Sequence, residues 1–337
     1  MHNSTIDIIP TEDFWSRQAN AQTETFEFTP LGMPATITAN EPALLAAAHL
    51  SAGRFSRAKP HLEKPISIQL VAGAGPMEKP PADLTERLGY MGVGDWITLS
   101  AGAWGQAFAN LRTRAAVLHL SPGLATATRL VSRYFIDHYL LNFILTEWAM
   151  LHASCILDPE EQRLIVMIAP HNVGKSTTAL RLLRAGFIFL ADGMVLLQQN
   201  GAGFQVGGYP IGEVKLRDDV LSLFPEYSGH AVRVREQRKT VIDLRAAHPE
   251  QLVDTLIEPN RIQLCFVEQA QTAHTRVTRL SPAEVIPAVA ANTVYWDKPS
   301  NLAHNSAILQ GLIQTAELYR LEIGIEAEGI ISTLTKL

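Results

Sequence analysis

The sequence reads Ile168-Ala169-Pro170-His171-Asn172-Val173-Gly174-Lys175-Ser176-Thr177 between an apolar run, residues 163–168, and a helix-like run, residues 178–183. A strand, a loop and a helix in this order, with Gly-Lys-Ser at the junction, are typical of a phosphate-binding loop. Backbone N–H groups of such a loop and of the first helical turn favour an anion. The lysine adds positive charge for the terminal phosphates, and the serine hydroxyl can hold Mg²⁺. The stretch therefore predicts a nucleotide-phosphate site made by Ala169, His171, Asn172, Val173, Gly174, Lys175, Ser176 and Thr177.

The first position of the motif departs from the usual pattern, G-x-x-x-x-G-K-[ST], because Ala169 stands where the first glycine is expected. The alternative interpretation is an ordinary turn between a strand and a helix that carries a surface lysine. The strand before the tripeptide and the helix after it favour the nucleotide interpretation.

The composition limits the classes of function. The chain has 337 residues, which favours two domains, and it is 47% apolar and 18% charged, as in globular proteins. Its formal net charge is −5. This charge argues against binding to nucleic acid or to an anionic membrane by overall attraction, so any basic site must be local.

Three features predict a cytoplasmic location. The two cysteines, Cys155 and Cys265, lie in apolar, strand-like runs, which predicts buried free thiols in a reducing compartment. The N-terminus lacks the basic and apolar pattern of a signal peptide. The longest apolar helix candidate, residues 130–153, is interrupted by Arg133, Asp137, His138 and Glu147 and is therefore predicted to be a packing helix rather than a membrane span.

The first half of the chain predicts an α+β domain over residues 1–122. Residues 1–22 are polar and predict little regular structure. Strands are predicted at 25–29 and 35–38, as a hairpin, and at 66–71, 96–100, 104–111 and 115–120, with a helix from Pro42 to Leu50. This domain shows no catalytic motif. We expect it to bind the phosphate acceptor or to mediate self-association, which would make the protein a homo-oligomer.

The second half, residues 123–337, predicts a mixed α/β domain around the phosphate loop. A long helix, residues 125–150, would lead into a tight hairpin of strands 151–157 and 163–168. The loop helix would end at Gly186. Further strands are predicted at 187–191, 194–199, 204–206, 214–216, 262–267 and 318–323, and further helices at 282–292, 305–316 and 327–334.

Asp192 follows the strand predicted after the loop helix. A strand, a crossover helix and a next strand form a parallel unit, so both strands end at the same sheet edge, where ligands bind. A carboxylate there can hold Mg²⁺ or take a proton from an attacking hydroxyl. The alternative is an aspartate that only caps a turn before Gly193.

His152 opens the predicted hairpin. Because the chain reverses near Glu160, the start of the first strand opposes the end of the second, which places His152 near Ala169. There it could contact a phosphate or steady a base. The alternative is a hydrogen-bonded histidine at a strand edge.

Charged residues alternate at Glu213, Lys215 and Arg217, so they share one face of a strand. We predict that the two cations contact phosphates and that Glu213 contributes to a metal site with Ser176 and Asp192. A solvent-facing strand side is the alternative. A basic run, Arg233 to Lys239, is either solvated or a local phosphate contact.

Several of these residues together resemble the catalytic domain of HPr kinase/phosphorylase and of the broader HPr-kinase-related proteins. They are His152-Ala153-Ser154, the loop from Ala169 to Ser176, Gly186 and Leu190-Ala191-Asp192. The family pattern is a histidine before the first strand, a loop reading G-x-x-G-x-G-K-S, and a strand ending in A-D-D. In this chain Ala169 stands at a family glycine and Gly193 at the second aspartate, and the family's glycine-rich signature after the sheet is not evident.

The resemblance implies a fold akin to PEP carboxykinase, the use of ATP and Mg²⁺, and transfer of the γ-phosphoryl group to a serine hydroxyl of a protein or peptide acceptor. It implies that Lys175 and Ser176 bind phosphate and Mg²⁺, that Asp192 is the catalytic base and that His152 is a site residue. Two other hypotheses stay open. One is a non-catalytic nucleotide sensor, and the other is a PEP-carboxykinase-like small-molecule enzyme.

Overall fold

The computed structural model describes residues 23–60, 65–170, 172–235, 239–293, 299–326 and 328–336. The chain divides into two compact units. Unit 1 contains the chain from the start to Thr29, Met33–Ala52 and Pro60–Phe143; unit 2 contains Pro30–Gly32, Gly53–Lys59 and Ile144–Leu337. The residues predicted to be loosely structured, 1–22, lie outside the described ranges.

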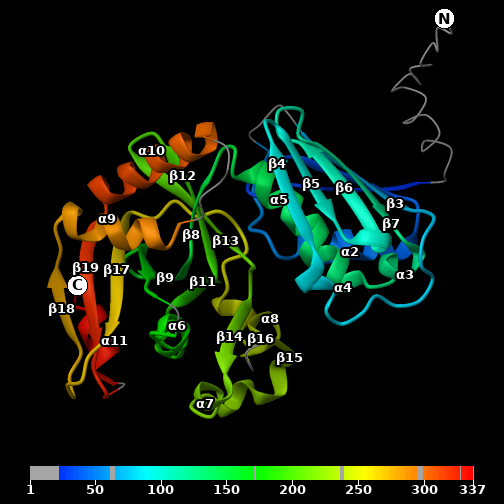
Figure 1. The fold of residues 1–337 in the computed structure, drawn as a ribbon. Helices are drawn as coiled ribbons and strands as arrows, with labels where there is room; N and C mark the ends of the chain where they lie inside the picture. Colours follow the sequence, from blue (N-terminus) through cyan, green and yellow to red (C-terminus); the bar gives the residue numbers. More distant parts are fainter. Residues whose placement is uncertain are drawn as a thin grey trace, which may run out of the picture. The chain divides into compact units, whose positions relative to one another are not determined.

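Unit 1 is built on a seven-stranded mixed sheet (Figure 1). In sheet order its strands are β1 (Glu24–Phe28), β2 (Ala35–Ala39), β3 (Ile66–Ala72), β7 (Ala115–Leu120), β6 (Gly105–Asn110), β5 (Trp96–Ser100) and β4 (Gly89–Val93). The predicted hairpin is present, since β1 pairs antiparallel with β2. Its helical segments are α2 (Pro42–Ala52), η1 (Leu84–Arg87), η2 (Gly102–Trp104), α3 (Pro122–Ala125), α4 (Thr128–Leu130), η3 (Val131–Ile136) and most of α5 (Asp137–Ile144).

The helical segment after β7 corrects two predictions. A single helix over 125–150 is wrong, because the segment is broken at 126–127, is π-helical in η3 and ends at Ile144. The predicted domain boundary at 122/123 also differs from the observed one, because this segment packs on α2 and belongs to unit 1. The hydroxyl of Ser51 in α2 donates a 2.6 Å hydrogen bond to buried Asp137, which ties the two helical segments together.

Unit 2 is built on a six-stranded sheet whose order is β11 (Ile188–Asp192), β9 (Ala153–Asp158), β10 (Arg163–Ile168), β17 (Arg261–Gln269), β19 (Glu317–Ile323) and β18 (Arg276–Arg279). Strand β10 is antiparallel to β9 and parallel to β17. Strand β11 is also antiparallel to β9. The strands before and after the loop helix are therefore parallel with β9 between them, and both end at one sheet edge, as predicted.

Two smaller sheets complete unit 2. One contains β13 (Gly203–Tyr209), β12 (Met194–Asn200) and β8 (Ala149–Leu151); the other contains β14 (Glu213–Arg217), β16 (Lys239–Asp243) and β15 (Ala231–Arg235). The strand predicted from Leu151 to Leu157 is thus divided, because Leu151 pairs with β12 whereas Ala153 begins the pairing with β10. His152 occupies the break between the two sheets.

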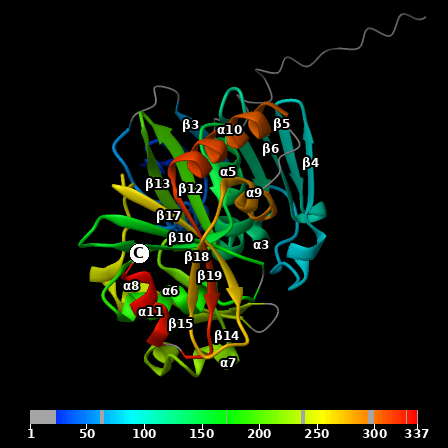
Figure 2. The same ribbon diagram turned by 90° about the vertical axis from the view of Figure 1, so that its left-hand side faces the viewer.

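Helices cover both faces of the six-stranded sheet (Figures 1 and 2). One core joins the sheet to β12, β13, α9 (Pro282–Ala291) and α10 (Pro299–Thr315). The other joins it to β14, α6 (Lys175–Arg184) and α11 (Glu328–Leu334). Successive β10 residues alternate between the two cores, so β10 is buried on both faces, as its continuous apolar sequence predicts. Short helices α7 (Asp218–Leu221), η4 (Pro225–His230), α8 (Leu244–Ala247) and η6 (Pro249–Gln251) connect the remaining strands.

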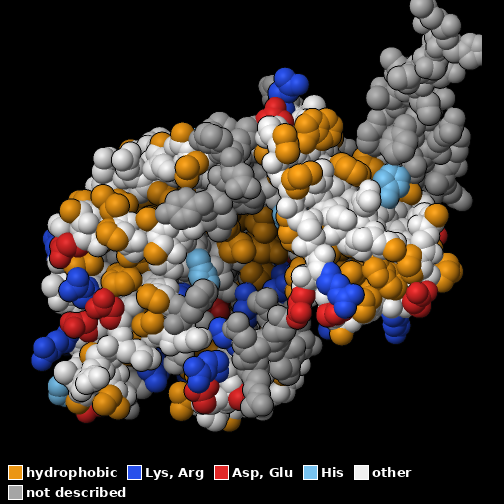
Figure 3. All heavy atoms as spheres, viewed as in Figure 1, with side chains coloured by type: hydrophobic (Ala, Val, Ile, Leu, Met, Phe, Trp, Pro, Cys, Tyr) orange, Lys and Arg blue, Asp and Glu red, His pale blue; other side chains and the backbone are white. Residues whose placement is uncertain are grey.

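Two sequence expectations can be checked elsewhere in the fold. Cys155 and Cys265 are buried free thiols on β9 and β17, and burial raises the pKa of both, that of Cys265 to about 12. Within the described ranges, no helix is both long and apolar enough to cross a membrane. On the face seen in Figure 3, basic and acidic side chains of the described residues are interspersed with apolar ones.

Candidate active site

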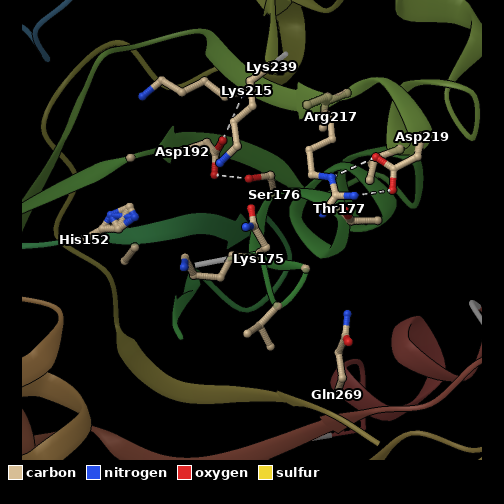
Figure 4. A pocket seen from close by; sticks show the side chains of 17 residues that line it. His152, Lys175, Ser176, Thr177, Asp192, Lys215, Arg217, Asp219, Lys239 and Gln269 are labelled. Atoms are coloured by element: carbon tan, nitrogen blue, oxygen red, sulfur yellow. Dashed lines mark hydrogen bonds and ion pairs between the residues drawn. The ribbon is translucent and has the colours of Figure 1, made fainter. Parts of the chain in front are cut away.

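The phosphate loop connects the end of β10 to the start of α6 in unit 2. Asn172 and Gly174 have positive φ angles, 65° and 109°, and asparagine and glycine are residues that accept this conformation readily. Gly174 directly precedes Lys175, the first residue of α6. The free N–H groups of the first helical turn therefore lie beside a cavity of about 420 Å³ that Asn172, Val173, Gly174, Lys175, Ser176 and Thr177 line (Figure 4).

Lys175 is held by the loop that precedes it. Its Nζ donates hydrogen bonds to the carbonyl oxygens of Ala169, at 2.8 Å, and Pro170, at 3.2 Å. Burial lowers the pKa of the Lys175 ammonium; the Asp192 carboxylate opposes that shift and Lys239 adds to it. An ammonium in this setting gains from a phosphate anion, since the anion replaces the hydration that burial removed.

Asp192 lies at the end of β11 and is 5% exposed. Its Oδ1 accepts hydrogen bonds from the Ser154 hydroxyl and, at 2.8 Å, from the Ser176 hydroxyl. Its Oδ2 accepts a 3.3 Å hydrogen bond from the Lys215 backbone N–H. The carboxylate thus joins the sheet edge, the loop helix and β14, and it lines the cavity (Figure 4).

His152 also lines this cavity. Its backbone N–H donates a 2.6 Å hydrogen bond to the Asn292 carbonyl oxygen at the end of α9. Because Ile168 pairs with Ala153, the next position in register sets His152 beside Ala169, as the hairpin argument predicted.

Strands β14 and β16 form a basic wall of the cavity. Lys215 and Arg217 alternate along β14, and Lys239 lies opposite Arg217 in the antiparallel register. Arg217 donates two 3.0 Å hydrogen bonds to Asp219, through Nε and Nη2. This bidentate pair engages the Arg217 guanidinium at the cavity edge, as the two dashed lines in Figure 4 show.

Most residues that the sequence singled out meet at this cavity, with three differences. Ala169 is buried under the loop and offers its carbonyl oxygen to Lys175 rather than lining the cavity. His171 lies outside the described residues. Glu213, expected as a metal ligand, is not among the lining residues, and its Oε1 lies 3.7 Å from the Arg54 Nε. The Glu213 carboxylate forms an ion pair with Arg54, and the alternation of residues along the strand could not predict this partner.

The cavity also includes residues outside the predicted set. They are Ala153, Gly193, Leu216, Asp219, Val220, Lys239 and Gln269. Two of them carried a usable signal. Lys239 belongs to the basic run that the sequence offered as a local phosphate contact, and Gln269 ends β17, the parallel neighbour of β10, so it reaches the same sheet edge. Strand β16, which carries Lys239, was not predicted.

The oxygen atoms beside the loop suit Mg²⁺. This ion binds through one or two carboxylates together with phosphate oxygens and several waters, so a complete protein cage is not required. Ser176 and Asp192 supply a hydroxyl and a carboxylate oxygen 2.8 Å apart. Among the described residues, no group of three or more His, Cys, Asp or Glu side chains is placed to hold a metal ion.

Comparisons with known proteins provide little support. No protein-family model matches the sequence, and no curated protein matches it. Among solved structures, the Hpr(Ser) kinase/phosphatase from Coxiella burnetii is similar to this chain with a TM-score of 0.31 and 13% identity, over 56% of this chain and 94% of that one. A likeness at this TM-score carries no argument about activity, which must rest on the geometry of the cavity.

Proposed function

We propose that this protein is an ATP-dependent kinase that transfers the γ-phosphoryl group to a hydroxyl of a protein or peptide acceptor, with serine as the acceptor residue. The observation that carries this proposal is the Asp192 carboxylate, 2.8 Å from the Ser176 hydroxyl at the start of α6 and beside the phosphate loop. A carboxylate at this place is what phosphoryl transfer to a hydroxyl requires, because the attacking oxygen must lose its proton.

The two oxygens of Asp192 suit different tasks. Oδ1 faces the Ser176 hydroxyl and would share a Mg²⁺ with it, and Mg²⁺ would neutralise charge on the phosphates. Oδ2 accepts a longer, 3.3 Å hydrogen bond from the Lys215 N–H. Oδ2 is therefore the oxygen that would accept the proton of the acceptor hydroxyl as that hydroxyl attacks the terminal phosphorus and ADP leaves.

The remaining residues of the site position the phosphates. Lys175 would leave the Ala169 and Pro170 carbonyl oxygens and bind phosphate oxygens, since a phosphate offers a stronger, charged acceptor. Lys215 and Arg217 would contact phosphates from β14, and His152 would lie beside the reacting groups at the edge of β9.

A nucleotide sensor without transfer is the second candidate. It is favoured by the hydrogen bonds that already engage both oxygens of Asp192, because such bonds also suit an aspartate that only anchors β11 to α6. The two candidates share the binding step and differ in the chemical step.

A single-turnover assay with γ-labelled ATP, Mg²⁺ and candidate acceptors separates the two. Proteins encoded by neighbouring genes are the first acceptors to use, with phosphoserine located by mass spectrometry. We expect label on a serine hydroxyl and stoichiometric ADP. Tight ATP binding without label transfer to any acceptor, and without slow hydrolysis, would favour the sensor.

A further inference from the structure

Lys239 lines the same cavity as Lys175, although the two lysines come from separate parts of the chain. Lys239 begins β16, the central strand of a three-stranded sheet, and its backbone pairs with Arg217 on β14. In Figure 4, Lys239 lies on one side of Asp192 and Ser176, and Lys175 lies on the other. The phosphate loop and β16 therefore approach the Asp192 carboxylate from two sides.

Among the described residues that line the cavity, cations outnumber carboxylates. Lys175, Lys215, Arg217 and Lys239 face two lining carboxylates, Asp192 and Asp219. Asp219 is engaged by Arg217 through two hydrogen bonds. Asp192 is thus the remaining lining carboxylate for three ammonium groups.

The Lys239 ammonium has no carboxylate partner among the residues that the structure describes. Its side chain makes no hydrogen bond or ion pair with those residues, whereas Arg217 beside it has Asp219. The positive charge of Lys239 repels that of Lys175 and contributes to the lowered pKa of the Lys175 ammonium. Two ammonium groups held near each other in one cavity repel, and an anion between them removes that cost.

We propose that Lys239 binds the terminal phosphate of the nucleotide, opposite the phosphate loop, and so makes the site select a triphosphate over a diphosphate. This inference rests on the proposed function, because it needs the phosphates to lie along the loop. The inner phosphates lie nearest the N–H groups at the start of α6, and the phosphate to be transferred must lie nearest the Asp192 carboxylate. Lys239 and Lys175 lie on opposite sides of Asp192. Lys239 therefore meets the outermost phosphate.

Calorimetric titration of the full chain with ATP–Mg²⁺ and, separately, ADP–Mg²⁺ tests this assignment. Lys239→Met removes the charge and keeps most of the aliphatic stem. We expect at least about a tenfold loss of ATP affinity and a change in ADP affinity of less than about twofold. Lys59→Met is the matched control, because Lys59 is an exposed lysine of unit 2 outside the cavity, and it should leave both affinities unchanged.

The charge-conserving variant Lys239→Arg should retain the preference for ATP, and Lys239→Gln should lose it as the methionine variant does. Retained ADP binding shows that a variant is folded. Equal losses for ATP and ADP, or no loss for either, would overturn the role of Lys239 while leaving the kinase proposal intact. Failure of the wild type to bind either nucleotide would overturn the proposed function itself.

Discussion

Unit 1 and unit 2 both bury ionisable side chains, but they give them different partners. In unit 1, His138 lies against aromatic rings, with its ring centroid 4.6 Å from that of Tyr90 and 5.2 Å from that of Tyr139. Burial lowers the pKa of His138 to about 4 and raises the pKa of Tyr139, so both are neutral at pH 7. These groups pack as parts of a core.

In unit 2, the largely buried side chains of Lys175 and Asp192 face a cavity and interact with each other. Lys175 is 9% exposed and Asp192 is 5% exposed, and both line the cavity beside Ser176. The Asp192 carboxylate favours the charged form of Lys175, whereas nothing comparable acts on His138. The comparison teaches that burial alone does not mark a site. A site is marked by charged side chains that line a cavity, where a ligand of opposite charge can bind and neutralise them.

Among the substitutions that test this comparison, the largest effect is expected on the rate of phosphoryl transfer when Asp192 is changed. Asp192→Asn keeps the size and some hydrogen bonding but removes the charge and the basicity. A positioned base contributes roughly 100- to 10,000-fold in rate, so phosphoryl transfer should nearly stop. ATP affinity should stay within about tenfold, or about 1.4 kcal/mol. Rapid-quench turnover and calorimetry on the same preparation measure the two quantities, and wild-type turnover by the variant would make Asp192 a turn residue.

The next effect is the loss of binding on removal of the loop lysine. Lys175→Ala removes a charge that would pair with phosphate in a partly buried place, and truncation of such a partner costs roughly 2–5 kcal/mol. ATP–Mg²⁺ affinity measured by calorimetry should therefore fall by at least about thirtyfold. Lys59→Ala serves as the exposed control. Equal affinities for Lys175→Ala and wild type would remove the phosphate-loop interpretation.

In unit 1 the expected effect is on stability and depends on pH. The pKa of His138 is about 4 in the folded state, below its ordinary value of 6.5, so the unfolded state binds more protons between these pH values. Stability is therefore fully present above pH 6.5 and is lost as the pH falls toward 4, by at most about 3 kcal/mol.

Hydrogen exchange of α5 amides in the full chain, followed from pH 7 to pH 4.5, measures this loss. The variant His138→Phe keeps a ring against Tyr90 and Tyr139 but cannot be protonated, so its exchange-derived stability should fall less steeply than that of the wild type. The same slope in both proteins would show that other groups set the acid sensitivity of unit 1.

The smallest effect is expected at Ala169. Its carbonyl oxygen, rather than its side chain, meets Lys175, so Ala169→Gly should keep or modestly raise nucleotide affinity. The methyl group belongs to the buried core under α6, and its removal should lower stability by about 1 kcal/mol. Calorimetry and thermal unfolding measure these changes. A large loss of affinity would mean that the alanine sets a loop shape of its own.

Local pattern and simple connection rules predicted much of unit 2. The apolar run of β10, the Gly174-Lys175-Ser176 junction and the amphipathic α6 are encoded within about twenty consecutive residues. The placement of Asp192 and His152 followed because the parallel orientation of β10 and β11 and the antiparallel hairpin leave few alternatives for where a strand ends.

The sequence pattern gave the wrong conformation or role where a segment or side chain could form either of two sets of contacts. The apolar residues Ala149–Leu151 suit a helix or a strand equally, and pairing with β12 decided for a strand. Glu213 has the chemistry of a metal ligand, but its ion pair with Arg54, a residue distant in the chain, took it out of the set of lining residues.

By itself, the sequence determined the phosphate loop, the strand and helix that flank it, and the sheet edge at which Asp192 and His152 lie, because these features depend on neighbouring residues and on the short paths between them. Only the tertiary structure decided that the loop faces Lys239. That lysine is separated from Lys175 by several strands, and the pairing of β14 with β16 depends on side chains that no local pattern joins.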